Sequence, residues 1–283
     1  MTGEEGFFSA SDGTKLLYRA WHQNSGHACL IIHGYGDHSE RYADLVNKLS
    51  DLPCSFYAFD LRGQGRSGGE RVYAKTTDDY VSDCYEFLDF LEKSGKLAAK
   101  RLMILGHSLG GLIALKAVLK NQTRWKALIL SSPCFQLYGI SWSPVAKWST
   151  QALSRIAPHL VMSNLVKPRY LFHNADSMKA YWQDPLIERR VTAHLACAII
   201  NACENIQREN IRLDIPVLVL ASGDDRIVEL SATKRVFEKL NAPSKSIVIY
   251  PDLYHEIFNE ERNEQAIRDL KQFMQTQIGE NPS

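Results

Sequence analysis

The chain contains 283 residues, of which 45% are hydrophobic and 23% are charged, a composition typical of a packed globular protein. Its 33 Lys and Arg residues balance 32 Asp and Glu residues, which leaves a formal net charge of +1. A surface without excess positive charge does not gather phosphates, so we expect no nucleic-acid partner. No apolar run approaches the roughly 20 residues that span a bilayer, so any membrane contact is expected to be peripheral.

The cysteines and the first residues bear on cellular location. Six cysteines are scattered without CxxC pairs, which favours reduced, buried thiols over a disulfide framework or a metal site. Residues 1–8 are acidic and no apolar run follows them, so we expect no secretion signal. We therefore predict a cytoplasmic protein, and leave peripheral membrane contact and the oligomeric state open.

The predicted elements begin with a β-hairpin, because strand-like runs flank the turn sequence Ser11-Asp12-Gly13. Short apolar runs of strand length follow at residues 29–32, 56–59, 102–105, 127–130, 217–221 and 247–250. Most of them lack polar alternation, which is typical of strands buried on both faces. Apolar residues at helical spacing over 42–49, 80–91 and 266–274 predict amphipathic helices.

Alternating strands and helices predict an α/β fold, with a mostly parallel central sheet and helices on both faces. The segment 135–205 breaks this alternation with a Trp-rich, Pro-punctuated stretch that has helical patches, including one at 191–203. We interpret it as an inserted helical cap on a core formed by residues 1–134 and 206–283. Ligands of such folds collect at the carboxyl ends of the strands.

The sequence Gly106-His107-Ser108-Leu109-Gly110 is the strongest chemical signal. It follows an apolar strand and precedes an apolar helix, the context in which G-x-S-x-G holds a nucleophilic serine in a strained turn. Small residues are needed two positions before and after the serine, and Gly106 and Gly110 meet that need. The alternative, a glycine-rich packing turn with an incidental serine, is disfavoured by this context.

A serine hydroxyl needs a base, and the base needs an orienting acid, in the chain order Ser, Asp or Glu, His. Two aspartates follow the strand at 217–221, and the spacing Asp-x-x-Val favours Asp225 over Asp224. His255 follows the next strand and is the predicted base. Its neighbour Glu256 gives an H-E-x-x sequence, but Asn259 stands where a zinc protease has its second histidine. The sequence therefore does not predict a zinc protease.

Two backbone N–H groups are predicted to stabilise the oxyanion of the tetrahedral intermediate. One belongs to Leu109, at the start of the helix after the serine. The other belongs to Tyr35, in the loop after the strand at 29–32, where Gly34 lets the backbone approach a ligand closely. We interpret His33 as a brace for this loop. We predict neither a metal nor an organic cofactor.

Two further blocks carry a family resemblance. The sequence His33-Gly-Tyr-Gly-Asp-His-Ser-Glu-Arg-Tyr42 resembles H-G-x-G-E-H-x-x-R-Y, and residues 60–71 are similar to D-x-x-G-H-G-x-S-x-G. With the G-H-S-L-G-G elbow and Asp-Pro-Leu at 184–186, nearly the whole chain resembles the monoacylglycerol lipase and lysophospholipase branch of the α/β hydrolases. Three residues depart from the family pattern: Gln64, Asp37 and Tyr35. We expect Gln64 and Asp37 to affect the bracing of loops, and the bulkier side chain of Tyr35 to narrow the pocket.

The resemblance implies that the cap is a lid over an apolar tunnel for one acyl chain. Seven apolar residues of the cap could line this tunnel: Trp142, Trp148, Leu160, Val161, Met162, Leu165 and Val166. Packing of the same residues in the core is an equally good explanation. We therefore expect a serine hydrolase that cleaves carboxylic esters of single-acyl-chain lipids through an acyl-enzyme. The alternatives are a small-ester carboxylesterase, a transacylase and, less favoured, a ligand-binding protein without catalysis.

Overall fold

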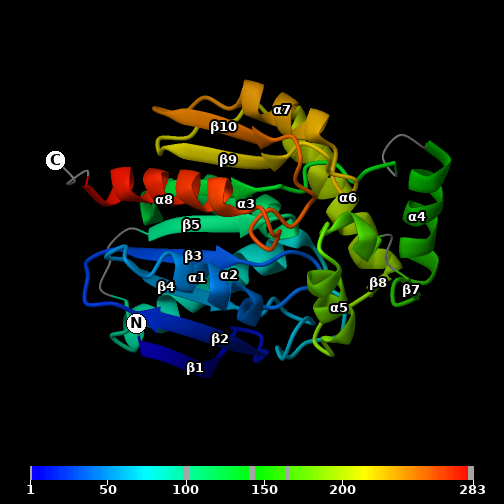
Figure 1. Cartoon of the computed structure of the whole chain (residues 1–283). Helices are drawn as coiled ribbons and strands as arrows, with labels where there is room; N and C mark the ends of the chain where they lie inside the picture. The colour runs from blue at the N-terminus through cyan, green and yellow to red at the C-terminus, as the bar shows by residue number, and fades with distance from the viewer. Residues whose placement is uncertain (1, 98–101, 140–143, 164–165, 280–283) are drawn as a thin grey trace.

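The computed structural model describes residues 2–97, 102–139, 144–163 and 166–279. Within these ranges the centre is an eight-stranded sheet with the order β1-β2-β4-β3-β5-β6-β9-β10 (Figure 1). The strands are β1 (Thr2–Ser9), β2 (Lys15–His22), β3 (Ala28–Ile32), β4 (Ser55–Phe59), β5 (Leu102–His107), β6 (Trp125–Ser131), β9 (Val217–Ser222) and β10 (Lys245–Tyr250).

The pairing of these strands confirms the predicted fold class. Strand β2 is antiparallel to both of its neighbours, β1 and β4, and all other neighbours in the sheet are parallel. The predicted opening hairpin and the six predicted strands are all present, within one or two residues of their expected ends, and the edge strand β10 is less buried than the other five.

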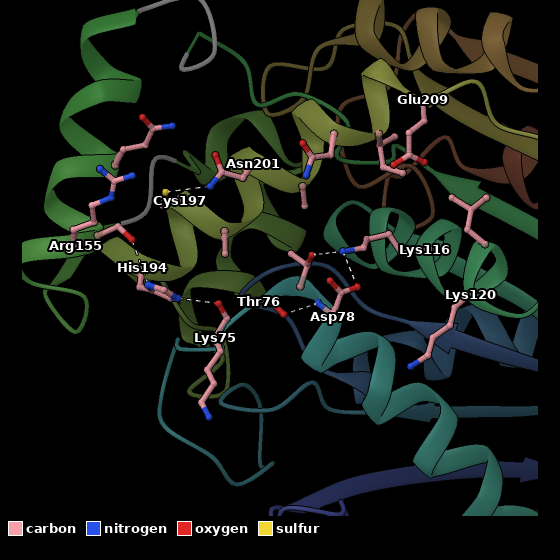
Figure 2. A pocket seen from close by; sticks show the side chains of 18 residues that line it. Lys75, Thr76, Asp78, Lys116, Lys120, Arg155, His194, Cys197, Asn201 and Glu209 are labelled. Atoms are coloured by element: carbon pink, nitrogen blue, oxygen red, sulfur yellow. Dashed lines mark hydrogen bonds and ion pairs between the residues drawn. The ribbon is translucent and has the colours of Figure 1, made fainter.

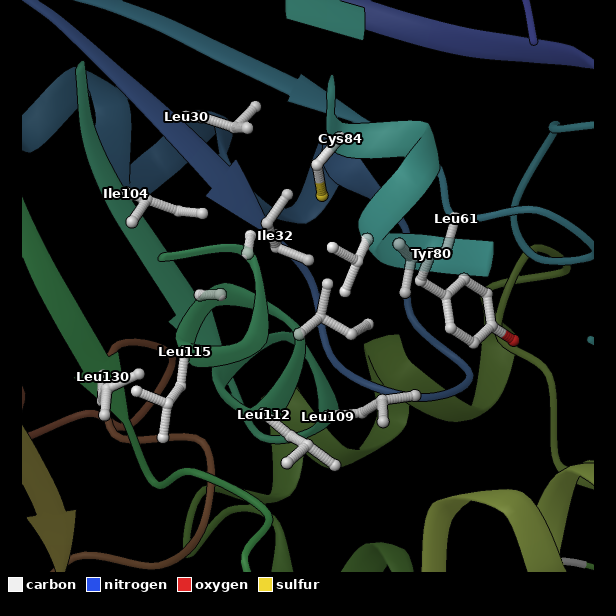
Figure 3. Packing of buried hydrophobic residues seen from close by; sticks show 14 of the residues in the cluster. Leu30, Ile32, Leu61, Tyr80, Cys84, Ile104, Leu109, Leu112, Leu115 and Leu130 are labelled. Atoms are coloured by element: carbon white, nitrogen blue, oxygen red, sulfur yellow. The ribbon is translucent and has the colours of Figure 1, made fainter. Parts of the chain in front are cut away.

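Helices cover both faces of the sheet, and side-chain alternation explains why. Cys29 and Ile31 of β3 belong to one buried cluster, with α1 (Ala43–Lys48) and α8 (Glu264–Gly279). Leu30 and Ile32 point to the opposite face and belong to a second cluster, with α2 (Thr77–Lys93) and α3 (Leu109–Lys120), as Figure 3 shows. Since the central strands β3, β4, β5 and β9 present apolar side chains to both faces, the sheet needs cover on both.

One helix and three short 3-10 turns were not expected. Helix α7 (Leu230–Lys239) buries Ala232, Thr233 and Val236, and its apolar residues lie at the spacing of an amphipathic helix, a signal that the sequence prediction did not use. The 3-10 turns are η1 (Ser39–Tyr42), η2 (Gln122–Arg124) and η3 (Pro168–Tyr170). None of the helices in the described part of the chain is long and apolar enough to cross a membrane.

The segment between β6 and β9 contains α4 (Pro144–Ile156), β7 (Val161–Ser163), α5 (Ala175–Gln183), β8 (Arg190–Thr192) and α6 (Ala193–Arg208). Figure 1 shows these elements grouped beside one end of the sheet. Strands β7 and β8 form a separate antiparallel pair, which the prediction of a helical segment did not include. Helix α6 continues to Arg208, and the division at residue 205 into core and cap stays a proposal.

Candidate active site

Ser108 occupies the sharp turn between β5 and α3. Its backbone has φ 52° and ψ −118°, in the left-handed half of the φ range that side chains other than glycine rarely adopt. A Cβ added at Gly106 would lie 2.2 Å from the Gly110 carbonyl oxygen, and one at Gly110 would lie 2.1 Å from the Ile32 carbonyl oxygen. Both positions therefore require glycine, for the steric reason given by the motif.

Backbone hydrogen bonds hold the strained turn in place. The Ser108 N–H donates to the Ser131 carbonyl at the end of β6, at 2.9 Å. The Ser108 carbonyl accepts from the N–H groups of Gly111 and Cys134, each at 2.9 Å. Ser108 is therefore held by the end of β6, by the first turn of α3 and by the segment that follows β6.

His255 and Asp225 are hydrogen-bonded to each other and buried. His255 follows β10, Asp225 follows β9, and His255 Nδ1 lies 2.7 Å from Asp225 Oδ2. The other carboxylate oxygen, Oδ1, accepts from the N–H groups of Ile227 at 2.8 Å and Val228 at 2.9 Å. Burial lowers the pKa of His255, but the charge and hydrogen bond of Asp225 outweigh burial and raise this pKa above its ordinary value of 6.5.

Asp224, the neighbour that the sequence left as an alternative, points elsewhere. Its carboxylate lies 3.1 Å from Arg226 Nε in a pair that is about half exposed. Of the two aspartates, Asp225 is therefore the one within hydrogen-bonding distance of His255.

Ser108 and His255 line the same cavity, which has a volume of about 330 Å³. Gly34 and Tyr35 also line it. A Cβ on Gly34 would lie 3.3 Å from Ser108 Cβ, so the loop after β3 passes directly beside the serine. The hydroxyl of Tyr35 donates to the carbonyl of Arg190 in β8, which ties this loop to the inserted segment. Leu109, the other residue predicted to donate an N–H to the oxyanion, is the first residue of α3.

His33 braces the loop after β3, as its position in the sequence suggested. Its Nδ1 lies 2.7 Å from the Gly34 carbonyl, and its Nε2 accepts from the Leu61 N–H at 2.8 Å. Burial lowers the pKa of His33, which favours the neutral ring that this donor–acceptor pair requires. Gln64 adds a second brace, because its Oε1 accepts from the Gly36 N–H at 2.7 Å.

A buried ionic cluster borders the cavity, and sequence reasoning missed it. Arg41 Nη1 lies 3.0 Å from Asp37 Oδ1, and Arg41 Nη2 lies 3.5 Å from Glu256 Oε2. His107 Nε2 lies 3.3 Å from Glu256 Oε1. Burial raises the pKa of Glu256, but Arg41 and then His107 outweigh burial and hold this pKa well below its ordinary range. The four-residue spacing of Asp37 and Arg41 was the available signal.

The inserted segment provides much of the apolar wall of the cavity, including Met162, Val166, Leu171, Val191, Ile199 and Ile200. Two of these, Met162 and Val166, were among the apolar residues expected there. Trp148, Leu160 and Val161 instead have exposed fractions of 70%, 46% and 47%, so the expectation that they line a tunnel or pack in a core was wrong. Trp142 and Leu165 lie outside the described residues.

A larger hollow, of about 850 Å³, is lined by Cys197 and Asn201 of α6 (Figure 2), whereas Ile199 and Ile200 of the same helix line the cavity of Ser108. The wall of the larger hollow also includes Lys116, which lies 2.9 Å from Asp78. Ser108, His255 and Asp225 do not line it, so this larger hollow is not where the predicted catalytic residues lie. In the described ranges, no three His, Cys, Asp or Glu side chains are grouped so as to hold a metal ion.

Comparison with known proteins settles the family. The profile of the serine aminopeptidase S33 family matches residues 23–262. The chain belongs to this family of hydrolases. The match extends from the residues just before β3 to the loop before α8, and therefore includes every residue of the predicted site.

Three relatives place this S33 hydrolase more closely. It is 27% identical over 273 residues to the uncharacterized protein YnbC of Escherichia coli, covering 95% of this chain and 46% of that protein, so the chain spans about half of the length of that relative. It is 26% identical over 273 residues to a monoacylglycerol lipase of Mycolicibacterium smegmatis, covering 95% and 96%. A crystal structure of Paleococcus ferrophilus monoacylglycerol lipase matches with a TM-score of 0.80 and 26% identity, covering 98% and 100%.

These comparisons confirm the predicted resemblance to the monoacylglycerol lipase branch of the α/β hydrolases. They also confirm that this S33 hydrolase is a carboxylic ester hydrolase. The identity of its ester is a separate question, which the chemistry of the cavity addresses.

Proposed function

We propose that this S33 hydrolase cleaves esters of a single acyl chain with a neutral, glycerol-like head group, as a monoacylglycerol lipase. The observation that carries the proposal is the cavity that Ser108 and His255 share, with Asp225 Oδ2 2.7 Å from His255 Nδ1. The similarity to the monoacylglycerol lipases of Mycolicibacterium smegmatis and Paleococcus ferrophilus supports the same substrate class.

In the proposed cycle, Ser108 Oγ attacks the ester carbonyl while His255 Nε2 takes the hydroxyl proton. The histidine passes that proton to the leaving alcohol, and the acyl group stays on Ser108. Water, deprotonated by His255, then hydrolyses the acyl-enzyme and releases the fatty acid. Asp225 holds the imidazole in the required tautomer and stabilises its charged form, and the cycle uses no cofactor.

The proposed oxyanion hole consists of the backbone N–H groups of Tyr35 and Leu109. The close approach of Gly34 to Ser108, 3.3 Å from a Cβ to Ser108 Cβ, supports a donor from this loop. The start of α3 at Leu109 supports the other, because the first N–H groups of a helix have no partner within it and carry partial positive charge. Removal of one such donor costs about 3 to 4 kcal/mol of transition-state stabilisation in a comparable enzyme.

The proposed acyl site lies against the cap, residues 135–205. Its support is the apolar wall that the inserted segment contributes, with Met162, Ile199 and Ile200 among its members. An acyl chain in contact with such a wall gains roughly 0.8 kcal/mol for each buried methylene. Esters of medium or long acids are therefore expected to outperform acetate.

The proposed head-group site favours a neutral alcohol over a phosphate. Two arginines line the cavity, and both already face carboxylates: Arg41 faces Asp37 and Glu256, and Arg226 faces Asp224. Because these carboxylates already compensate the two arginines, little positive charge is left to attract a phosphodiester. Hydroxyl groups, in contrast, can donate hydrogen bonds to a carboxylate.

The proposal is tested by hydrolysis of p-nitrophenyl esters of increasing acyl length, beside monoacylglycerol and lysophosphatidylcholine, with Ser108→Ala as control. We expect activity to peak at medium or long chains, to favour monoacylglycerol and to vanish in the control. Activity confined to acetate or butyrate would instead identify a small-ester carboxylesterase. Acyl transfer to an added alcohol in preference to water would identify a transacylase, and activity that survives in the Ser108→Ala protein would refute the mechanism.

A further inference from the structure

The loop that carries His255 is joined to the turn that carries Ser108 by a contact between their neighbours in the sequence. Glu256 follows His255 and His107 precedes Ser108, and Glu256 Oε1 lies 3.3 Å from His107 Nε2. The rings of His107 and His255 are also in contact, with centroids 4.9 Å apart. Both residues of this bridge are buried and border the cavity.

Each end of the bridge is anchored to a different part of the fold. His107 Nδ1 lies 3.2 Å from Ser131 Oγ, at the end of β6. Glu256 Oε2 accepts from Asn259 Nδ2 at 2.7 Å and faces Arg41, and the Glu256 N–H donates to the Leu171 carbonyl at 3.2 Å. The Glu256 side chain therefore links the histidine loop to the turn at β5 and to the loop after β3.

We propose that Glu256 is a positioning residue for the ester hydrolysis proposed above: its bridge to His107 and Arg41 holds the His255 loop in register with Ser108. Alignment of base and nucleophile is a large part of catalytic rate, since an error of about 1 Å can lower a rate by about 100-fold. The strained turn at Ser108 cannot move to follow the histidine, because Gly106 and Gly110 are packed against backbone on both sides. The alignment must then be set from the side of the histidine.

The charges around His255 give this bridge a second effect, on pH dependence. Asp225 and Glu256 face His255 with negative charge, and His107 faces it from β5. Around Glu256 the other titratable groups are Arg41, with Asp37 beyond it, and the tyrosines Tyr42 and Tyr181. Removal of the Glu256 charge therefore removes one of the two negative charges that favour protonated His255, and the pKa of His255 falls.

The test compares Glu256→Gln, which removes the charge at nearly constant shape, with Glu256→Asp, which keeps the charge but shortens the reach. For Glu256→Gln we expect kcat to fall about 10- to 100-fold with KM nearly unchanged, and the acid limb of the kcat/KM profile to shift to lower pH. For Glu256→Asp we expect a lower kcat with the acid limb close to that of the wild type. Glu261→Gln, at an exposed position of the same loop, is the matched control and should match the wild type.

A fluorophosphonate probe that labels Ser108 supplies a readout that does not depend on the natural ester. Wild-type protein that is labelled but does not cleave monoacylglycerol would refute the proposed substrate and leave the test of Glu256 intact, with labelling rates in place of kcat. Labelling and hydrolysis that are unchanged in rate and pH profile in Glu256→Gln would overturn the positioning role. If Glu256→Gln fails to fold, an unchanged kcat in Glu256→Asp overturns it equally.

Discussion

Cys134 Sγ lies 3.9 Å from Cys203 Sγ, between the segment that follows β6 and helix α6. Cys203 also donates to the Cys134 carbonyl at 3.1 Å. The neighbouring Cys134 thiol and then burial raise the pKa of Cys203 well above its ordinary value. The pair is therefore a reduced, hydrogen-bonded contact, since a disulfide needs its sulfurs about 2.05 Å apart.

All six cysteines are buried and free, so we expect the native protein to react slowly with thiol reagents. The thiolate is the reactive form, and burial disfavours it. Titration with Ellman's reagent should detect six thiols in denaturant and no fast-reacting thiol in native buffer. A thiol that reacts within seconds in the native protein would show that one of these side chains is accessible.

Substitution of Asp225 should separate the two adjacent aspartates. Asp225→Asn removes the negative charge that faces His255 and favours the wrong tautomer of the imidazole ring. We therefore expect kcat to fall by about 10⁴. Asp224→Asn removes only the half-exposed contact with Arg226 and should change kcat by no more than a few-fold. Equal losses in the two variants would contradict the assigned role of Asp225.

The activity of the enzyme should rise with pH along a limb centred above pH 6.5. In the proposed cycle His255 must be neutral to accept the serine proton, and Asp225 raises the pKa of His255 above 6.5. The stability that the charged pair contributes is fully present below pH 6.5 and is lost as the pH rises through the raised pKa of the folded protein. A kcat/KM profile measures the limb, and a midpoint below 6.5 would refute the assignment.

Substitution of glycines by alanine should test whether the turn at Ser108 requires glycine for steric reasons. In Gly110→Ala the added Cβ would lie 2.1 Å from the Ile32 carbonyl oxygen, and backbone atoms of a central strand cannot move aside. We expect a loss of about 3 kcal/mol or more in the free energy of unfolding. Gly26→Ala, which meets nothing within 4 Å, should change the Tm little. Thermal unfolding of the two variants is the measurement.

The exposed side of α4 should mediate any contact with a lipid surface. Val145, Trp148 and Ile156 of this helix have exposed fractions of 74%, 70% and 83%, and apolar side chains on one exposed helix favour an interfacial position. We expect Trp148→Ser to lower binding to phosphatidylcholine vesicles in a flotation assay while the Tm stays unchanged. Trp182→Ser, on α5, is the matched control. Binding that is lost equally in both variants would rule out a specific role of α4.

Local patterns carried most of the fold and the central residues of the site. The buried strands follow from short apolar runs, and the Ser108 turn from the glycines that its geometry requires. The features that could not be predicted depend on contacts between segments far apart in the chain. Arg41 contacts Glu256, and Cys134 contacts Cys203, across more than 60 residues. The cap residues Trp148 and Val161 were misjudged for the same reason, because an apolar side chain does not reveal which side of its element faces the protein.

The bridge between His107 and Glu256 also constrains how this enzyme can be recombined with its relatives. In each of the dipeptides His107-Ser108 and His255-Glu256, one residue is a proposed catalytic residue and the other contacts its counterpart in the second dipeptide. A chimera that grafts one of these loops from a relative with a different neighbour would leave a buried charge facing the wrong group, and such an unpaired charge is strongly destabilising. The two loops, nearly 150 residues apart in the chain, should therefore be exchanged together or left alone.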